Sequence, residues 1–334
     1  MTFDERADAV ARKGFTERQA RFLVTVMLHS GVCMDRQYCA FAGIRHGQKT
    51  EDFFGGLVKQ RAATIYRCAH GRARIFHVQR RILYEAIGER DSRLRRPTPI
   101  ARAVERLMLL DAVLASSDVT WLATERDKLA HFTLLLKSRV GRDELPHLTF
   151  RSGPSKTVRY FPDRQPIGVH ADGRTHVFTY LVNRDVPVDF RPFLRRHAAL
   201  LRGLPRWTVR LLVPRHLADA VGLYETAWRE EFASPLRLST AEEMRWYFEQ
   251  RRRLTGGKAE SNGHDEARYT RARDAFGAPR YRVLYRSWLQ HGPSVLTEVV
   301  SPVLADAIAR GTGRLETREL SHPYLHLAPL VTTA

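Results

Sequence analysis

The stretch TEDFFGGLVKQRAATIYRCAHGRARIFHV, residues 50–78, decides how the first part of this chain folds. Thr50 is a suitable N-cap for a helix over 51–60. The apolar residues of that helix recur at the spacing of one helix face, at Phe53, Phe54, Leu57 and Val58. Strand-like residues at 63–68 and 74–78 then flank a turn at 69–72, which is typical of a hairpin.

Two helices are predicted before this stretch and one after it. Thr16 and Gln19 form a capping-box pattern, and Gly31 ends the helix that they begin. Asp35 caps a helix over 36–42. A last helix over 80–87 follows the hairpin. Three helices, a hairpin and a further helix are the order of a winged helix-turn-helix domain, which we assign to residues 1–88.

In that fold the third helix enters the major groove and the wing lies on the DNA backbone or in the minor groove. Glutamine and lysine side chains suit base edges and phosphates. The candidate DNA-binding residues of the third helix are Gln48, Lys49, Thr50, Asp52 and Lys59. Those of the wing are Arg67, His70, Arg72 and Arg74. The alternative is a solvated basic face on a domain that binds protein.

The charge of the chain favours a polyanionic partner. The 334 residues carry 55 Lys and Arg against 36 Asp and Glu, a formal net charge of +19. Residues 61–96 alone hold ten arginines and three acids. Nucleic acid is favoured over a membrane surface, because no basic amphipathic helix stands apart from a core. No apolar run approaches the roughly 20 residues of a membrane span, and the N-terminus has no apolar signal core. We therefore expect a cytoplasmic, nucleoid-associated bacterial protein without a membrane partner.

The sequence predicts no catalytic residue, metal site or cofactor. Its three cysteines, Cys33, Cys39 and Cys68, are too few for a disulfide framework and do not have the spacing of a structural zinc site. Serine nucleophile elbows and phosphate-binding glycine loops do not occur.

The rest of the chain divides into three predicted parts. Residues 89–116 are a charged linker and a connecting helix over 100–115, interpreted as a packing or dimer helix. Alternating strands and helices over 117–234 predict a compact α/β domain. Residues 235–334 are predicted to be mainly helical, with one helix over 293–310. The predicted fold class is α+β, in which the winged helix precedes a restriction-endonuclease-like α/β domain and a helical C-terminal region.

The nuclease-like assignment depends on Tyr160-Phe-Pro-Asp163 and the strand at 176–182. A Pro-Asp at a strand entry, followed by an acid and a lysine on the next strand, is typical of nucleases whose acids hold Mg²⁺. The strand at 176–182 has neither residue. We therefore predict an inactive domain, with a Mg²⁺-dependent nuclease that uses Asp163 as the alternative.

Taken together, these motifs resemble the replication-relaxation type of plasmid and mobile-element proteins. The similarity covers about residues 12–215. It is carried by Thr16–Gln19, Phe53–Val58, Arg72–His77, Tyr160–Asp163 and Phe178–Val182. The resemblance implies a winged helix paired with a nuclease-like α/β domain, and a role in plasmid replication, relaxation or transfer.

The predicted function is sequence-specific binding of double-stranded DNA on a mobile element, for replication or transfer initiation or for transcriptional regulation. A protein-interaction component of a transposition or defence complex is the second alternative. One expected partner is a second copy of the chain in a homodimer, because paired half-sites are usual for helix-turn-helix proteins. Protein partners within a replication or transfer complex are a further expectation.

Overall fold

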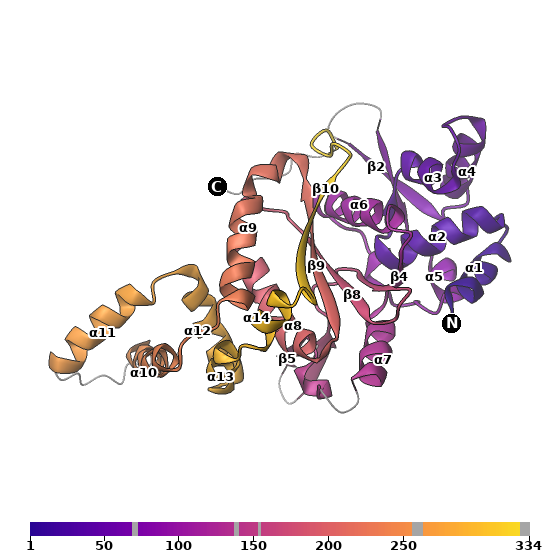
Figure 1. The fold of residues 1–334 in the computed structure, drawn as a ribbon. Coiled ribbons are helices and arrows are strands. Elements are labelled where there is room, and N and C mark those ends of the chain that lie inside the picture. The colour runs from indigo at the N-terminus through magenta and orange to yellow at the C-terminus, as the bar shows by residue number, and fades with distance from the viewer. Residues whose placement is uncertain (69–72, 137–139, 153–154, 256–262, 328–334) are drawn as a thin grey trace.

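The computed structural model describes residues 1–68, 73–136, 140–152, 155–255 and 263–327. They form a mixed α/β structure that is compatible with the predicted α+β class (Figure 1). Within these ranges, no helix combines the length and the apolar character that crossing a membrane requires.

The N-terminal unit, defined as residues 1–88, packs helices against one face of a small antiparallel sheet. Strand β1 pairs with β3, and β3 pairs with β2. Thr16 caps α2 and forms the predicted capping box with Gln19. The elements are α1 (Phe3–Ala11), α2 (Glu17–His29), β1 (Val32–Cys33), α3 (Asp35–Ala42), α4 (Gln48–Lys59), β2 (Ala63–Arg67), β3 (Arg74–Val78) and α5 (Arg81–Ala86).

The start of α4 differs from the prediction. The helix begins at Gln48 with Gly47 as its N-cap, so Thr50 lies inside the first turn. The Thr50 side chain is buried, and its hydroxyl lies 3.5 Å from Cys39 Sγ. An N-cap side chain must instead face the open end of its helix. Two elements of the N-terminal unit were not predicted: α1, which has its own capping box at Thr2 and Glu5, and the two-residue strand β1.

Helix α6 (Ile100–Leu114) lies between the N-terminal unit and the rest of the molecule and packs against both. One side of α6 covers the small sheet, where it packs against Val32 and Ile75. The other packs against Leu181, Leu212 and Leu320 of the central sheet. The two sheets therefore share one apolar layer (Figure 1).

The central sheet has the strand order β10-β9-β8-β7-β4. Its three strands β8, β9 and β10 run parallel, whereas β7 and β4 are antiparallel to their neighbours. Successive residues of β8 and β9 face α6 on one side and α8 and α9 on the other. The elements up to this point are η1 (Arg93–Arg95), β4 (Val119–Leu122), α7 (Glu125–Leu135), η2 (Arg142–Glu144), β7 (Ile167–His170), β8 (Thr175–Leu181), α8 (Phe190–Gly203), β9 (Arg206–Pro214), η3 (Arg215–Ala220), α9 (Val221–Trp228) and a π-helical turn (Arg229–Ala233).

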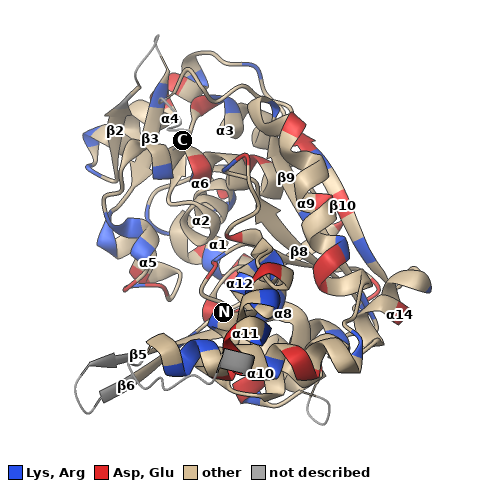
Figure 2. Cartoon of the chain, turned by 90° about the vertical axis from the view of Figure 1, so that its left-hand side faces the viewer, with Lys and Arg blue, Asp and Glu red and all other residues tan. Residues whose placement is uncertain are grey.

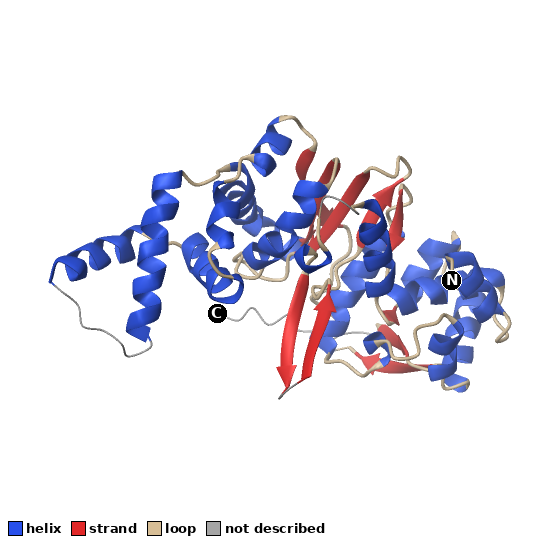
Figure 3. Ribbon diagram, turned by 90° about the horizontal axis from the view of Figure 1, so that it is seen from below, coloured by secondary structure: helices blue, strands red, loops and turns tan. Residues whose placement is uncertain are grey.

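Two parts project from the central sheet. Strands β5 (His147–Ser152) and β6 (Ser155–Tyr160) form a separate two-stranded ribbon, seen as the long pair of strands in Figure 3. A helical arm, residues 238–300, extends to one end of the molecule (Figures 1 and 3) and has its own aromatic cluster around Phe248 and Trp288. Its helices are α10 (Leu238–Thr255), α11 (Gly263–Ala275), α12 (Pro279–His291) and α13 (Ser294–Val300).

The end of the chain departs from the helical prediction. The single helix expected over 293–310 is two helices, α13 and α14 (Val303–Ala309). They are separated at Ser301 and Pro302, because proline cannot continue a helix from the preceding turn. Strand β10 (Gly313–Leu320) then pairs with β9 in parallel over its whole length. Residues 313–320 therefore belong to the central sheet and are not helical.

Candidate nucleic-acid interface

Helix α4 has one buried aromatic face and one exposed polar face. On the buried face, Phe53 and Phe54 pack with Tyr38, and Phe54 stacks on Phe76 of β3 with ring centroids 4.3 Å apart. This packing fixes the rotation of the helix about its axis. The opposite face presents the exposed side chains of Gln48, Lys49, Asp52 and Lys59.

The polar face of α4 is partly self-paired. Gln48 Nε2 donates a hydrogen bond of 2.7 Å to Asp52 Oδ1, one helical turn away. Lys49 and Lys59 form no ion pair among the described residues, so their ammonium groups are free for an anionic partner. Four of the five candidate residues on this helix are thus exposed on one side, and the buried Thr50 is the exception.

The two glycines of α4 lie on the same exposed side. A Cβ atom built on Gly55 or on Gly56 would meet no other atom within 4 Å. Packing inside the chain therefore does not account for either glycine, and both cost helical propensity. Between Lys49 and Lys59 the helix backbone is open to close approach from outside.

The wing residues are less available than predicted. Arg74 Nη2 donates to both carboxylate oxygens of Glu51, at 2.9 and 3.0 Å, and lies 3.8 Å from Asp35. Arg74 therefore links β3 to the start of α4 and is neutralised there. Arg67 ends β2, but nothing is described of its side chain, and His70 and Arg72 lie outside the described residues.

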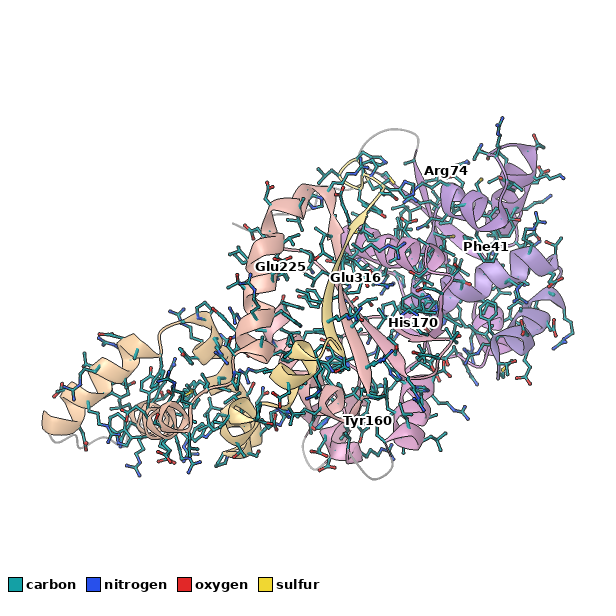
Figure 4. The ribbon with its side chains drawn as sticks, viewed as in Figure 1. Phe41, Arg74, Tyr160, His170, Glu225 and Glu316 are labelled. Carbon is teal, nitrogen blue, oxygen red and sulfur yellow. The ribbon has the colours of Figure 1, made fainter. Side chains whose placement is uncertain are left out.

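The predicted nuclease residue Asp163 faces an arginine. Arg196 of α8 donates to both Asp163 oxygens, from Nη2 at 2.5 Å and from Nε at 3.3 Å. In the described ranges, no three His, Cys, Asp or Glu side chains are grouped so that they could hold a metal ion. Figure 4 shows Tyr160, which begins this motif, at the opposite side of the molecule from Arg74.

Buried polar groups support the turn that holds Asp163. Lys128 is buried and donates from Nζ to the Gln165 carbonyl at 2.8 Å. Burial lowers the pKa of Lys128 to about 8. The Thr179 hydroxyl donates to the Pro166 carbonyl at 2.6 Å. These contacts hold the backbone of the turn in place.

Sequence reasoning missed a group of arginines where the N-terminal unit meets the rest of the molecule. They are Arg93 and Arg95 of η1 and Arg102 and Arg106 of α6, and among the described residues only Arg102 has a carboxylate partner, Glu105. Figure 2 shows basic segments gathered around α5 and the stretch that follows it. The charged linker was visible in the sequence, but nothing local indicated which of its arginines would lack an acid partner.

Comparison of the chain with protein-family models, with curated proteins and with solved structures finds no significant match.

Proposed function

We propose that the chain binds double-stranded DNA as a winged helix-turn-helix protein, with α4 as the recognition helix and the β2–β3 hairpin as the wing. The exposed polar face of α4 carries this proposal. It is the side of a short helix that packs on the sheet through aromatic residues and presents two lysines for which the described residues supply no acid partner. The order α2-β1-α3-α4-β2-β3 and the sheet order β1-β3-β2 also support it.

Within this proposal the residues take different roles. Lys49 and Lys59 neutralise backbone phosphates, because a flexible ammonium is a point charge without base preference. Gln48 reads a base edge, once its side chain leaves Asp52. Arg74 is a positioning residue, since its guanidinium is held by Glu51 and sets the hairpin against α4.

The α/β part of the chain serves in this proposal as a nuclease-like scaffold without cleavage activity. The pairing of Asp163 with Arg196 supports that assignment. A role in replication or transfer of a mobile element comes from the family resemblance and is proposed on that basis alone. Divalent-metal-dependent DNA cleavage that is lost in Asp163→Ala would overturn the assignment.

The test is duplex binding by the full chain. The parent chain first selects its preferred sequence from a pool of random DNA duplexes. Its affinity for that duplex is then measured by fluorescence anisotropy at several salt concentrations. Lys49→Ala and Lys59→Ala should each weaken binding and reduce the slope of log affinity against log salt by about 1, which corresponds to one lost phosphate contact.

Lys13→Ala is the matched control, because Lys13 is an exposed lysine that lies outside α4, between α1 and α2. It should keep the parent slope. The proposal is wrong if the parent binds no duplex at low salt. The assignment of α4 is wrong if the parent binds and the double variant of Lys49 and Lys59 binds equally well.

A further inference from the structure

Two arginines of the helical arm lie against a pair of aromatic rings. The guanidinium carbon of Arg251 is 4.4 Å from the centroid of the Tyr285 ring, and that of Arg252 is 5.0 Å from the centroid of the Trp288 ring. The two rings are stacked, with centroids 6.2 Å apart and an angle of 15° between their planes. Phe248, one turn earlier in α10, contacts both rings and anchors α10 to α12. The packing of the arm therefore places a guanidinium group against each ring of a fixed pair.

A third stacked arginine of the arm has the acid partner that these two lack. Arg268 of α11 lies 3.9 Å from the centroid of the Trp246 ring and donates to the two oxygens of Glu243, at 3.2 and 2.6 Å. Among the described residues, Arg251 and Arg252 have no carboxylate within ion-pair distance and donate no side-chain hydrogen bond. Arg252 is exposed and Arg251 half-buried. Stacking occupies the face of a guanidinium and leaves the N–H donors on its edge for another partner.

The charge at this end of α10 exceeds what helix packing needs. Arginine stems cover apolar surface, and a cation in the last turn complements the helix dipole. Here three arginines follow one another at 251–253, and the acid before them, Glu249, makes no ion pair in the described part of the chain. Like charges this close repel one another, so the arginines cost stability until an anion neutralises them.

We propose that Arg251 and Arg252 bind the phosphate backbone of a nucleic-acid duplex. The planar guanidinium fork matches two phosphate oxygens, and an arginine already held on a ring loses less freedom when it binds. A polymer with a phosphate at every step can meet both groups at once, which favours a nucleic acid over a single small anion. The arm and α4 lie at opposite ends of the molecule (Figure 1). This contact therefore goes beyond the proposed function and does not need recognition by α4.

The test is binding of a random-sequence duplex by the full chain, because backbone contacts carry no sequence preference. Fluorescence anisotropy at several salt concentrations gives the slope of log affinity against log salt. Arg251→Gln and Arg252→Gln should each reduce this slope by about 1, and the double variant by about 2. Arg268→Gln is the matched control, since it removes the same charge from a stacked arginine of the same arm that Glu243 already neutralises. It should keep the parent slope.

Thermal unfolding without DNA separates a binding role from a packing role. Arg252→Gln should melt close to the parent, because the side chain is exposed and the lost ring contact is offset by weaker repulsion within 251–253. If Arg251→Gln does not fold, the exposed Arg252 carries the test alone. A lower melting temperature in Arg252→Gln together with the parent slope would make it a packing residue and overturn the proposal. Equal slopes in the parent and the double variant would also overturn it.

The arm contact and the proposed role of α4 can fail separately. Duplex binding that depends on Arg251 and Arg252 but not on Lys49 and Lys59 supports the arm contact and contradicts α4 as the recognition helix. The reverse dependence contradicts the arm contact. A parent that binds no duplex at low salt contradicts both. In that case, binding of polyglutamate that is lost in the double variant of Arg251 and Arg252 would assign this surface to an acidic protein partner.

Discussion

Asp111 joins three segments that are far apart in the sequence. Its two oxygens accept hydrogen bonds of 2.8 and 2.7 Å from Arg36 of α3, and Tyr324 near the end of the described chain donates to it at 2.5 Å. The Asp111 side chain is only 13% exposed, so water compensates little for a lost partner. The carboxylate thereby fastens the helix before α4 to α6.

We expect Asp111→Ala to lower the free energy of unfolding by about 2 kcal/mol, because it leaves a half-buried guanidinium and a buried phenol without their acceptor. The midpoint of urea unfolding measures this. Asp219→Ala removes an exposed aspartate without an ion pair among the described residues and should change the midpoint little. Equal midpoints for the two variants would contradict the expectation.

His197 makes stability depend on pH. It is buried in α8 beside Phe178 and Phe193, and its Nδ1 lies 2.9 Å from the Phe193 carbonyl oxygen. Burial lowers the pKa of His197 to about 4, although Asp163 acts in the opposite direction. Between this value and the unfolded value near 6.5, the unfolded chain binds the proton and the folded chain does not.

The stability contributed by the neutral ring is therefore present above pH 6.5 and is lost as the pH falls through about 4. At pH 5 the loss from this one histidine is about 2 kcal/mol. The urea midpoint of the parent should fall from pH 7 to pH 5. His197→Gln should start lower at pH 7 and fall less steeply. Parallel declines would show that His197 does not titrate in this way.

At the scale of elements, α4 illustrates what a local pattern can predict. The apolar spacing of Phe53, Phe54 and Leu57 identified the helix and its buried face. The start was placed three residues late, since Thr50 has the residue type of a cap but its side chain lies in the core. Whether a threonine caps a helix or packs inside it depends on neighbours such as Cys39, which the local sequence does not reveal.

Gly55 allows stability and binding to be separated within α4. We expect Gly55→Ala to raise the free energy of unfolding by roughly 0.5–1 kcal/mol, because alanine favours the helix and its Cβ meets open space. The same methyl group should weaken duplex binding if the glycine face approaches DNA. Thermal unfolding and anisotropy measure the two effects.

Gly222→Ala in α9 is the matched control for this change. Its Cβ would also meet no atom within 4 Å, so it should stabilise the chain without affecting duplex binding. Duplex affinity that stays at the parent value in Gly55→Ala would show that the bare face of α4 is not a contact surface.

At the scale of the whole molecule, the last strand closes the structure. β10 follows the helical arm and returns to pair with β9. Leu320 and Tyr324 then enter the apolar layer that α6 shares with both sheets. The end of the described chain therefore stabilises the central sheet and the attachment of the N-terminal unit together.

A chain that ends at residue 311 should lose β10 and the Tyr324 contact, and should melt well below the parent or fail to fold. A chain that ends at residue 327 keeps every contact described for this segment and should melt close to the parent. Differential scanning calorimetry compares the two. A shortened chain that retains the parent melting temperature would contradict the role assigned to β10.

The sequence by itself determined the elements whose signals lie within a few residues of one another. The Thr16 and Gln19 cap of α2, the β2–β3 hairpin and the amphipathic α6 were all predicted close to their observed bounds. Helix capping, hairpin turns and apolar periodicity act over one or two turns of chain, so they can be recognised without knowledge of the fold.

Only the tertiary structure decided the pairings between distant segments. Charged residues mostly alternate with uncharged ones along β10. The segment becomes a strand because β9 supplies its hydrogen-bond partners. Asp163 meets Arg196, 33 positions later in the chain, and Asp111 meets Tyr324, 213 positions later. Such contacts depend on how the chain returns on itself, and no local pattern contains that information.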